Sequence, residues 1–224
     1  MQGPKAVNPL PPSVLALFAV MALVEVVLSL GGSVGIGGAQ AIGWRNEALS
    51  EFALPPRMLS AMAQTGDYQL DYLRRFVTYP FVHGGFLHAA FACVILLALG
   101  KFVGEVFSSA AVIVVFFTSG ILAALIYSGL AWSNYPLFGA YPAVYGLIGA
   151  YTYILWVGIA ATGGRQIEAF RLILILAGLH IAFSVFGVSP HIIADFAGFA
   201  VGFAVAPLAA PGGVKALMTR IKRR

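Results

Sequence analysis

The sequence contains few charged residues. Only 9% of its 224 residues are charged and 60% are hydrophobic, whereas a typical soluble domain has about 25% charged residues. So few charged side chains do not cover a water-exposed surface, even though the net charge is +5. The composition argues against a soluble enzyme, a disordered protein and a nucleic-acid-binding domain, and it indicates a polytopic membrane protein.

Cysteine is almost absent as well. Cys93 is the only cysteine, so the chain forms no intrachain disulfide and offers no cysteine-rich zinc site. The sequence has no His-Glu-x-x-His stretch, and His83 and His88 are expected to face different directions because they are five residues apart on a predicted helix. We therefore expect no metal and no other cofactor.

Long stretches without charge predict the membrane spans. No charged residue or histidine occurs in residues 106–164, and a spanning helix needs about 20 residues. This stretch therefore holds two helices, with a turn at Trp132–Pro136. Together with its neighbours it predicts six spans, at about residues 14–30, 76–99, 108–130, 139–160, 170–186 and 192–208.

Lysine and arginine are unevenly distributed between the two sides of this predicted bundle. The richer side carries Lys5, Lys101, Arg165, Arg171, Lys215, Arg220, Lys222, Arg223 and Arg224. The other side carries Arg45, Arg57, Arg74 and Arg75. Cytoplasmic segments hold the excess of basic residues, so we expect a cytoplasmic N-terminus at 1–13, a membrane domain at 14–208 and a basic cytoplasmic tail at 209–224 that touches anionic lipid.

The segment between the first two predicted spans, Gly31–Arg75, is too long for a simple turn and too polar to span a bilayer. Apolar residues such as Trp44, Phe52, Met58 and Met62 are spaced as in one or two short amphipathic helices. Such helices lie in the membrane interface. The sequence shows no internal repeat and no soluble domain.

Polar residues inside predicted spans are costly and are functional candidates by default. They are Glu25, His83, His88, His180 and Asp195. His180 is interpreted as a hydrogen-bonded core residue. His191 and Asp195 are four residues apart on one helix face, which predicts a hydrogen bond between them.

Three stretches of the sequence stand out. The first runs from Arg75 through His83-Gly84-Gly85 to His88, the second from Gly139 to Ala150, and the third from Ala194 to Gly202. They resemble the rhomboid intramembrane protease family, in the order that the family requires. The resemblance extends over about residues 14–208. It implies an all-α membrane protein, a six-transmembrane-helix rhomboid-like bundle with a long interfacial first loop.

The sequence departs from this family at the positions that perform its chemistry. Tyr141 stands at the nucleophilic serine, Pro142 at the glycine after it, and Asp195 at the catalytic histidine. Ala92 replaces an asparagine that binds the oxyanion. A phenol with a reference pKa of about 10 is a poor acyl nucleophile, and oxyanion donors are also needed. We therefore expect no catalytic residue.

The resemblance assigns a former active-site cavity, which Tyr141 is expected to fill while its hydroxyl bonds to His88 or Asp195. The residues assigned to this cavity are His83, His88, Ala92, Gly139, Tyr141, Pro142, Tyr145, His191 and Asp195. A separate pattern of small residues is interpreted as close helix packing. These are Ala194, Gly198, Gly202 and Ala206, with Gly146 and Ala150 on another predicted helix.

The hypothesis that follows is a rhomboid-fold pseudoprotease that binds transmembrane client proteins. A compact six-span core without a recognised targeting signal suits a bacterial inner membrane. Two alternatives remain open. One is an active rhomboid-type intramembrane serine endopeptidase with an unrecognised arrangement, and the other is a proton or small-solute transporter that uses Glu25 and Asp195.

Overall fold

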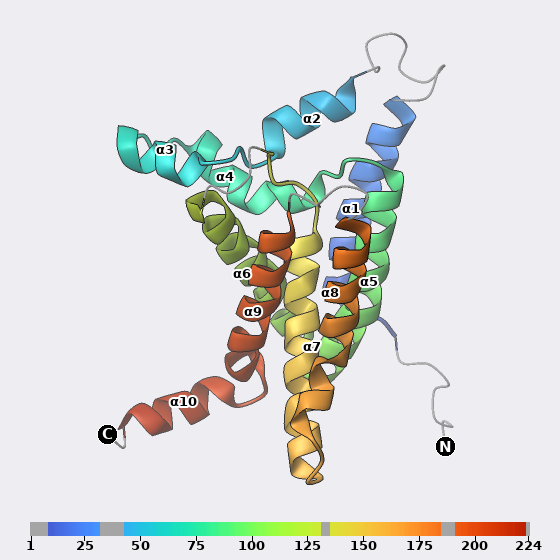
Figure 1. Ribbon diagram of the computed structural model, residues 1–224, viewed down its shortest axis with the longest axis vertical. Coiled ribbons are helices and arrows are strands. Elements are labelled where there is room, and N and C mark those ends of the chain that lie inside the picture. Colours follow the sequence, from blue (N-terminus) through green and yellow to red (C-terminus); the bar gives the residue numbers. More distant parts are fainter. Residues whose placement is uncertain (1–8, 32–42, 131–134, 185–190, 223–224) are drawn as a thin grey trace.

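The protein is a bundle of long helices with short helices across one end (Figure 1). The computed structural model describes residues 9–31, 43–130, 135–184 and 191–222. The side chains of residues 179–184, 214, 216, 217, 220 and 221 lie outside this description, and the prediction for His180 therefore falls outside it as well. The helices are α1 (Pro12–Gly31), α2 (Trp44–Phe52), α3 (Met58–Thr65), α4 (Leu70–Thr78), α5 (Phe86–Val106), α6 (Ser109–Leu130), α7 (Tyr141–Ala161), α8 (Arg171–Ser184), α9 (Ile192–Ala209) and α10 (Gly213–Lys222).

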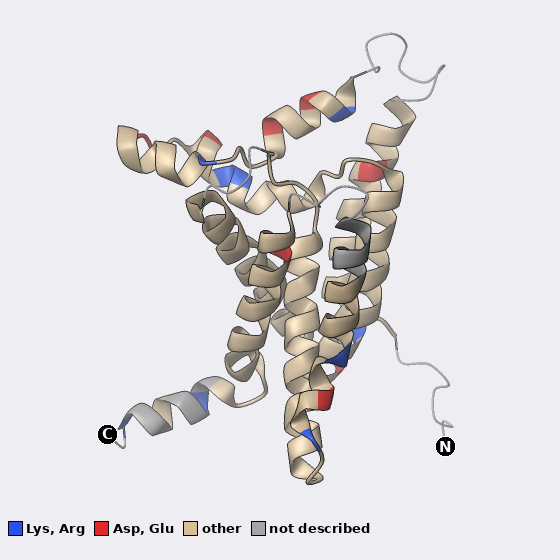
Figure 2. Ribbon diagram, viewed as in Figure 1, with Lys and Arg blue, Asp and Glu red and all other residues tan. Residues whose placement is uncertain are grey.

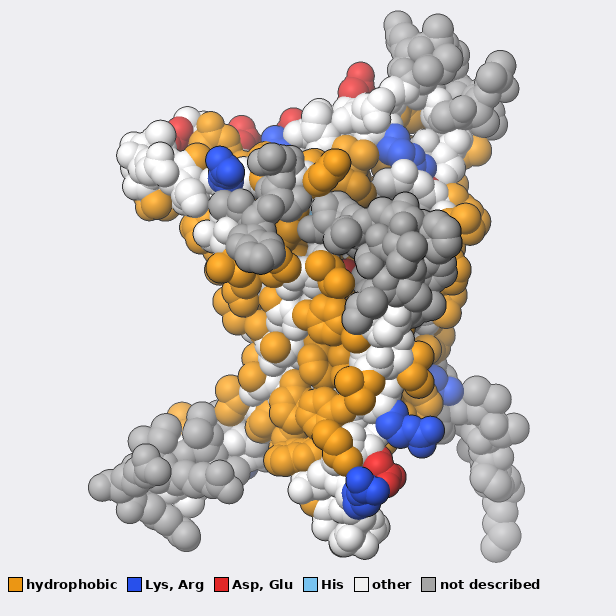
Figure 3. Space-filling view, in the orientation of Figure 1, with side chains coloured by type: hydrophobic (Ala, Val, Ile, Leu, Met, Phe, Trp, Pro, Cys, Tyr) orange, Lys and Arg blue, Asp and Glu red, His pale blue; other side chains and the backbone are white. Residues whose placement is uncertain are grey.

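Five of the described helices, α1, α5, α6, α7 and α9, are long and apolar enough to cross a membrane. They confirm five of the six predicted spans. The remaining prediction, 170–186, corresponds to α8, of which 14 residues are described. Hydrophobic side chains cover the middle of the face in Figure 3, and the charged ones visible there lie towards its two ends. The predicted fold class, an all-α membrane bundle, is therefore confirmed.

The predicted span 76–99 is wrong at its beginning. Residues up to Thr78 belong to α4, a 3₁₀ turn follows at Tyr79–Phe81, and α5 begins at Phe86. Pro80 has no backbone N–H to continue the ladder of α4, and Gly84-Gly85 then interrupt the helix again. His83 consequently lies in an extended connection and not on a spanning helix.

The first loop contains the expected short helices. α2 and α3 lie within Gly31–Arg75, and α4 is a third short helix. They lie across one end of the bundle in Figure 1. Their buried side chains, among them Met58, Met62 and Phe76, pack with Tyr127 of α6 and with Leu137. Leu54 and Leu137 also exchange backbone hydrogen bonds of 2.9 and 2.8 Å.

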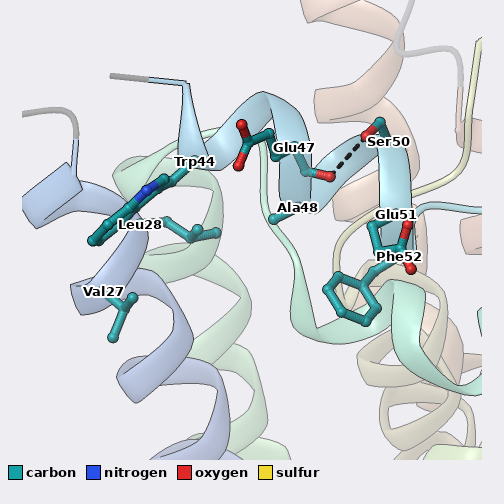
Figure 4. Close-up of a pocket in the computed structure, with 8 residues that line it drawn as sticks. All are labelled: Val27, Leu28, Trp44, Glu47, Ala48, Ser50, Glu51 and Phe52. Carbon is teal, nitrogen blue, oxygen red and sulfur yellow. Dashed lines mark hydrogen bonds between the residues drawn. The ribbon is translucent and has the colours of Figure 1, made fainter. Parts of the chain in front are cut away.

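α2 stands over the end of α1, and an open, shallow pocket lies between them (Figure 4). Val27 and Leu28 of α1 form its lower wall, while Trp44 and Phe52 extend towards them from α2. Glu47, Ser50 and Glu51 of α2 line the same pocket, and the Glu47 carbonyl oxygen accepts a hydrogen bond of 2.8 Å from Ser50 Oγ. The side of α2 that faces α1 is therefore mixed apolar and polar.

α7 lies in the middle of the bundle and packs closely on α9. A Cβ added at Gly198 would lie 2.0 Å from Pro142 O, and one at Gly202 would lie 2.0 Å from Gly146 O. A Cβ at Gly149 would lie 2.2 Å from Phe199 O. The two backbones thus approach at distances that only glycine permits. The predicted packing role of the small residues is confirmed.

Candidate functional site

The assigned cavity residues lie where three helices begin, beneath the short helices α2–α4. His88 lies in the first turn of α5, and Tyr141 is the first residue of α7. His83 and His191 precede α5 and α9, and Asp195 lies in the first turn of α9. Because the starts of these helices meet at one end of the bundle, residues far apart in the sequence form one cluster.

His88 is the centre of an aromatic cluster. Its ring stacks on Tyr141, with 4.9 Å between centroids and an interplanar angle of 15°. His83 meets the same ring edge-on at 5.4 Å. The prediction that the two histidines face different directions is therefore wrong, because His83 lies outside α5 and is not held in helical register with His88.

Tyr141 touches His88 through this ring stack and not through the hydrogen bond expected of its hydroxyl. The nitrogen lone pairs and N–H groups of an imidazole lie in the ring plane. The planes of the two rings differ by 15°. The lone pairs and N–H groups of His88 therefore run nearly parallel to the phenol ring and do not aim at its oxygen. The contact between Tyr141 and His88 is therefore a ring stack.

Gly139 allows the chain to pass beside this stack. Its φ is +89°, in the left-handed region, and an added Cβ would lie 2.7 Å from His88 Cε1. Its N–H donates a hydrogen bond of 3.0 Å to Tyr79 O. Both the backbone conformation and the space therefore require glycine here.

Each of the three histidines whose side chains the structure describes forms a hydrogen bond with a backbone group. His83 Nε2 accepts a hydrogen bond from the Ala140 N–H at 3.3 Å, and His88 Nδ1 accepts one from the Gly84 N–H at 3.2 Å. His191 Nε2 donates to Pro136 O at 2.9 Å. The first two fix the connections that enter α7 and α5, and the third fixes the connection between α6 and α7 near the start of α9.

His83 acts as an acceptor because it stays neutral. The residue is fully buried, and this burial, followed by the charge of His88, lowers the pKa of His83 to about 4. The Nε2 atom that accepts from Ala140 then carries no proton, which leaves the proton on Nδ1.

His191 does not form the predicted hydrogen bond with Asp195. Its Nε2 bonds Pro136 O, and its ring packs edge-on against Phe138, with centroids 5.0 Å apart. His191 precedes α9 as the cap residue, so it does not share the helix face of Asp195 as the spacing assumed. Phe138 also lies edge-on to His88 at 5.8 Å, and it connects the two histidines.

The remaining assigned residues pack beneath this layer. Ala92 is fully buried, Asp195 is 2% exposed and Tyr145 is 1% exposed. Tyr145 meets Phe196 edge-on at 6.1 Å. Asp195 interacts electrostatically with both Tyr141 and Tyr145, so the positions assigned to the nucleophile and the base do lie near each other.

A partly buried ion pair lies next to the cluster, and neither of its residues was assigned to the former active-site cavity. Arg45 Nη2 donates to Glu25 Oε1 at 2.8 Å, and Arg45 Nη1 donates to Oε2 at 3.1 Å and to His83 O at 2.7 Å. Ser29 Oγ donates to the same carboxylate at 2.8 Å. The partner of Glu25 is therefore Arg45.

Fold and site together define a helical polytopic membrane protein in which aromatic and histidine side chains from three helix ends pack into one cluster. The Rhomboid domain model matches residues 71–211, which is more than half of the chain. The protein therefore belongs to the rhomboid family. A comparison with curated proteins finds no match.

Proposed function

We propose that this protein is a rhomboid pseudoprotease that binds the transmembrane segments of client proteins without cleaving them. The observation that carries the proposal is the geometry at Tyr141. The residue at the nucleophile position is a phenol stacked at 15° on His88, and the described histidine rings each bond backbone groups. In this arrangement the ring nitrogens of His88 do not aim at the Tyr141 hydroxyl, so His88 is not placed as a base for it.

The loss of oxyanion donors supports the same conclusion. Ala92 presents only a methyl group where the family carries an amide, and it is fully buried. Removing one oxyanion donor slows a serine protease by about a hundredfold to a thousandfold. Here the nucleophile and base positions are changed as well, so each requirement of acyl transfer is affected.

The apolar outer surfaces of α5 and α8 support binding of a transmembrane segment. Phe91 and Val94 of α5 are each 61% exposed, and Leu174 and Ile175 of α8 are 62% and 65% exposed. Large apolar side chains on this surface provide van der Waals contact for another helix in lipid. A client that binds here stays intact because the cluster beside it does not perform acyl transfer.

We also propose the location and orientation of the protein. Nine of its basic residues belong to the side that includes both termini, and four to the side of α2–α4. The rule that cytoplasmic segments are enriched in lysine and arginine favours cytoplasmic termini. The compact bundle is suited to a bacterial inner membrane.

The first experiment tests proteolysis. The purified protein is reconstituted in liposomes with transmembrane peptides and, separately, treated with a fluorophosphonate probe for activated serines. We expect neither cleavage nor labelling, while an active rhomboid protease in the same liposomes gives both. The variant carrying Tyr141→Ser and Asp195→His measures what the two changed positions contribute. Cleavage by the unaltered protein would overturn the proposal.

The second experiment tests client binding. A photo-cross-linking amino acid replaces Phe91 or Ile175 in cells, and the matched control replaces Val114, which is 50% exposed on α6. We expect the first two positions to yield peptides cross-linked within transmembrane segments of other proteins, and the control to yield them much less. Equal yields at all three positions, or none at any, would contradict client binding at α5 and α8.

A further inference from the structure

The helix α10 leaves the bundle at a fixed angle. Gly212 has a φ of +75°, and a Cβ added at Gly213 would lie 2.0 Å from Pro207 O. The chain therefore turns sharply and closely against the end of α9. In Figure 1, α10 runs away from the bundle axis at the end opposite to α2–α4.

The sequence of α10 is amphipathic. Helical spacing places Val214, Leu217, Met218 and Ile221 on one stripe. Lys215 and Lys222 flank this stripe, Thr219 lies further round the helix, and all three are exposed. Met218 is 59% exposed, so the described part of the bundle does not cover the apolar stripe at that position.

The charge on and around α10 has one predominant sign. Residues 210–224 contain Lys215, Arg220, Lys222, Arg223 and Arg224 and no acidic residue. The ends of α5, η3 (Gln166–Phe170) and α8 on the same side add Lys101, Arg165 and Arg171, against Glu105 and Glu168. Figure 2 shows these described charges at the end of the bundle where α10 departs. At the other end, four arginines are balanced by four acidic residues of α2–α4 and their connections.

We propose that α10 is a membrane-surface helix that binds anionic phospholipid headgroups. Only three residues separate it from α9, and three residues span at most roughly 10 Å. Because α9 is membrane-spanning, α10 begins at the bilayer boundary. An apolar stripe flanked by basic residues matches the acyl region and the negatively charged headgroups of such a surface.

A membrane surface accounts for both faces of α10. A nucleic acid would match the basic residues but would leave Met218 in water, whereas a lipid surface buries it. The inference concerns a different end of the molecule from the cluster at Tyr141 and does not depend on client binding.

The test compares two labels, one within the apolar stripe and one outside it. In a Cys93→Ala background, Met218→Cys and Thr219→Cys are each spin-labelled and placed in nanodiscs of phosphatidylcholine, with or without phosphatidylglycerol. Collisions with oxygen report the acyl region, and collisions with a soluble nickel complex report water. We expect the label at 218 to be shielded from nickel in anionic discs, and the label at 219 to stay accessible.

Two charge variants complete the test. The double variant Lys215→Gln/Lys222→Gln is expected to abolish the shielding of the 218 label from nickel. Arg165→Gln, at the same end of the bundle but outside α10, is expected to leave that shielding unchanged. Equal nickel accessibility of the two labels in anionic discs would overturn the proposal. It would also be overturned if the label at 218 were equally shielded in both lipids, or shielded only after a nucleic acid was added.

Discussion

Arg45 donates hydrogen bonds to both carboxylate oxygens of Glu25, at 2.8 and 3.1 Å, and to the carbonyl oxygen of His83 at 2.7 Å. One guanidinium thus joins α2 to α1 and to the connection that precedes α5. The Glu25 side chain is 6% exposed and that of Arg45 is 22% exposed. The pair therefore links the first loop to the aromatic cluster through a mostly dry contact.

Replacing Arg45 by alanine is expected to destabilise the protein strongly. The change leaves Glu25 buried without its cation, and breaking a buried pair in this way costs about 3–5 kcal/mol. The free energy of unfolding, measured in mixed detergent by tryptophan fluorescence, should fall by this amount. Adding Glu25→Gln to Arg45→Ala should restore much of the loss, because it removes the uncompensated charge.

The matched control is Arg74→Ala. Arg74 pairs with Glu51 across a more exposed contact, with side chains 32% and 53% exposed, and such pairs contribute about 0–1 kcal/mol. If Arg45→Ala were no more damaging than Arg74→Ala, the pair between Arg45 and Glu25 would not be an important connection.

The sequence predicts the spans well because they depend on a local property, the absence of charge over about 20 residues. It predicts the start of α5 poorly. The helix is interrupted at Pro80 and at Gly84-Gly85, but both positions lie within an apolar stretch in which hydropathy marks no boundary. The partner of Glu25 shows a second limit. A carboxylate within a span signals that a compensating group exists, but several arginines follow it, and only the packing of α2 selects Arg45.

The contact between α7 and α9 gives the second prediction. Gly202→Ala would place a Cβ 2.0 Å from Gly146 O, so the helices must separate and the free energy of unfolding should fall by about 1–3 kcal/mol or more. Gly158→Ala on α7 is the control, since nothing lies within 4 Å of its added Cβ. That control should be neutral or slightly stabilising. Similar unfolding curves for the two variants would show that the helices tolerate separation at this point.

The turn before α7 gives the third prediction. Gly139→Ala forces a side chain into a left-handed conformation, at about 1–2 kcal/mol, and also brings its Cβ to 2.7 Å from His88 Cε1. Gly163 has a φ of +72° but nothing within 4 Å of an added Cβ. Gly163→Ala should therefore show the backbone effect alone, and Gly139→Ala a larger loss in thermal unfolding. Equal losses would mean that His88 moves aside without resistance.

The sequence indicated several residues that meet at the site, but it did not indicate the contacts that they make there. The resemblance assigned His88 and Tyr141 to one cavity, and the structure places their rings in contact. It did not assign Phe138, although this ring bridges His88 and His191, because nothing in the spacing of an aromatic residue before Gly139 reveals which rings it will meet. Hydrogen bonds depend on ring orientation, which only packing determines.

The stack between Tyr141 and His88 gives the last prediction. Tyr141→Phe keeps the ring and should change the free energy of unfolding by less than about 0.5 kcal/mol, as substitutions that preserve contacts do. Tyr141→Ala removes both buried area and the stack and should cost about 1–3 kcal/mol. A double-mutant cycle with His88→Ala isolates the contact, for which we expect a coupling of about 0.5–1.5 kcal/mol. If the coupling is near zero, or if Tyr141→Phe is as damaging as Tyr141→Ala, the hydroxyl and not the stack holds this residue, and the argument that its ring excludes a catalytic geometry fails.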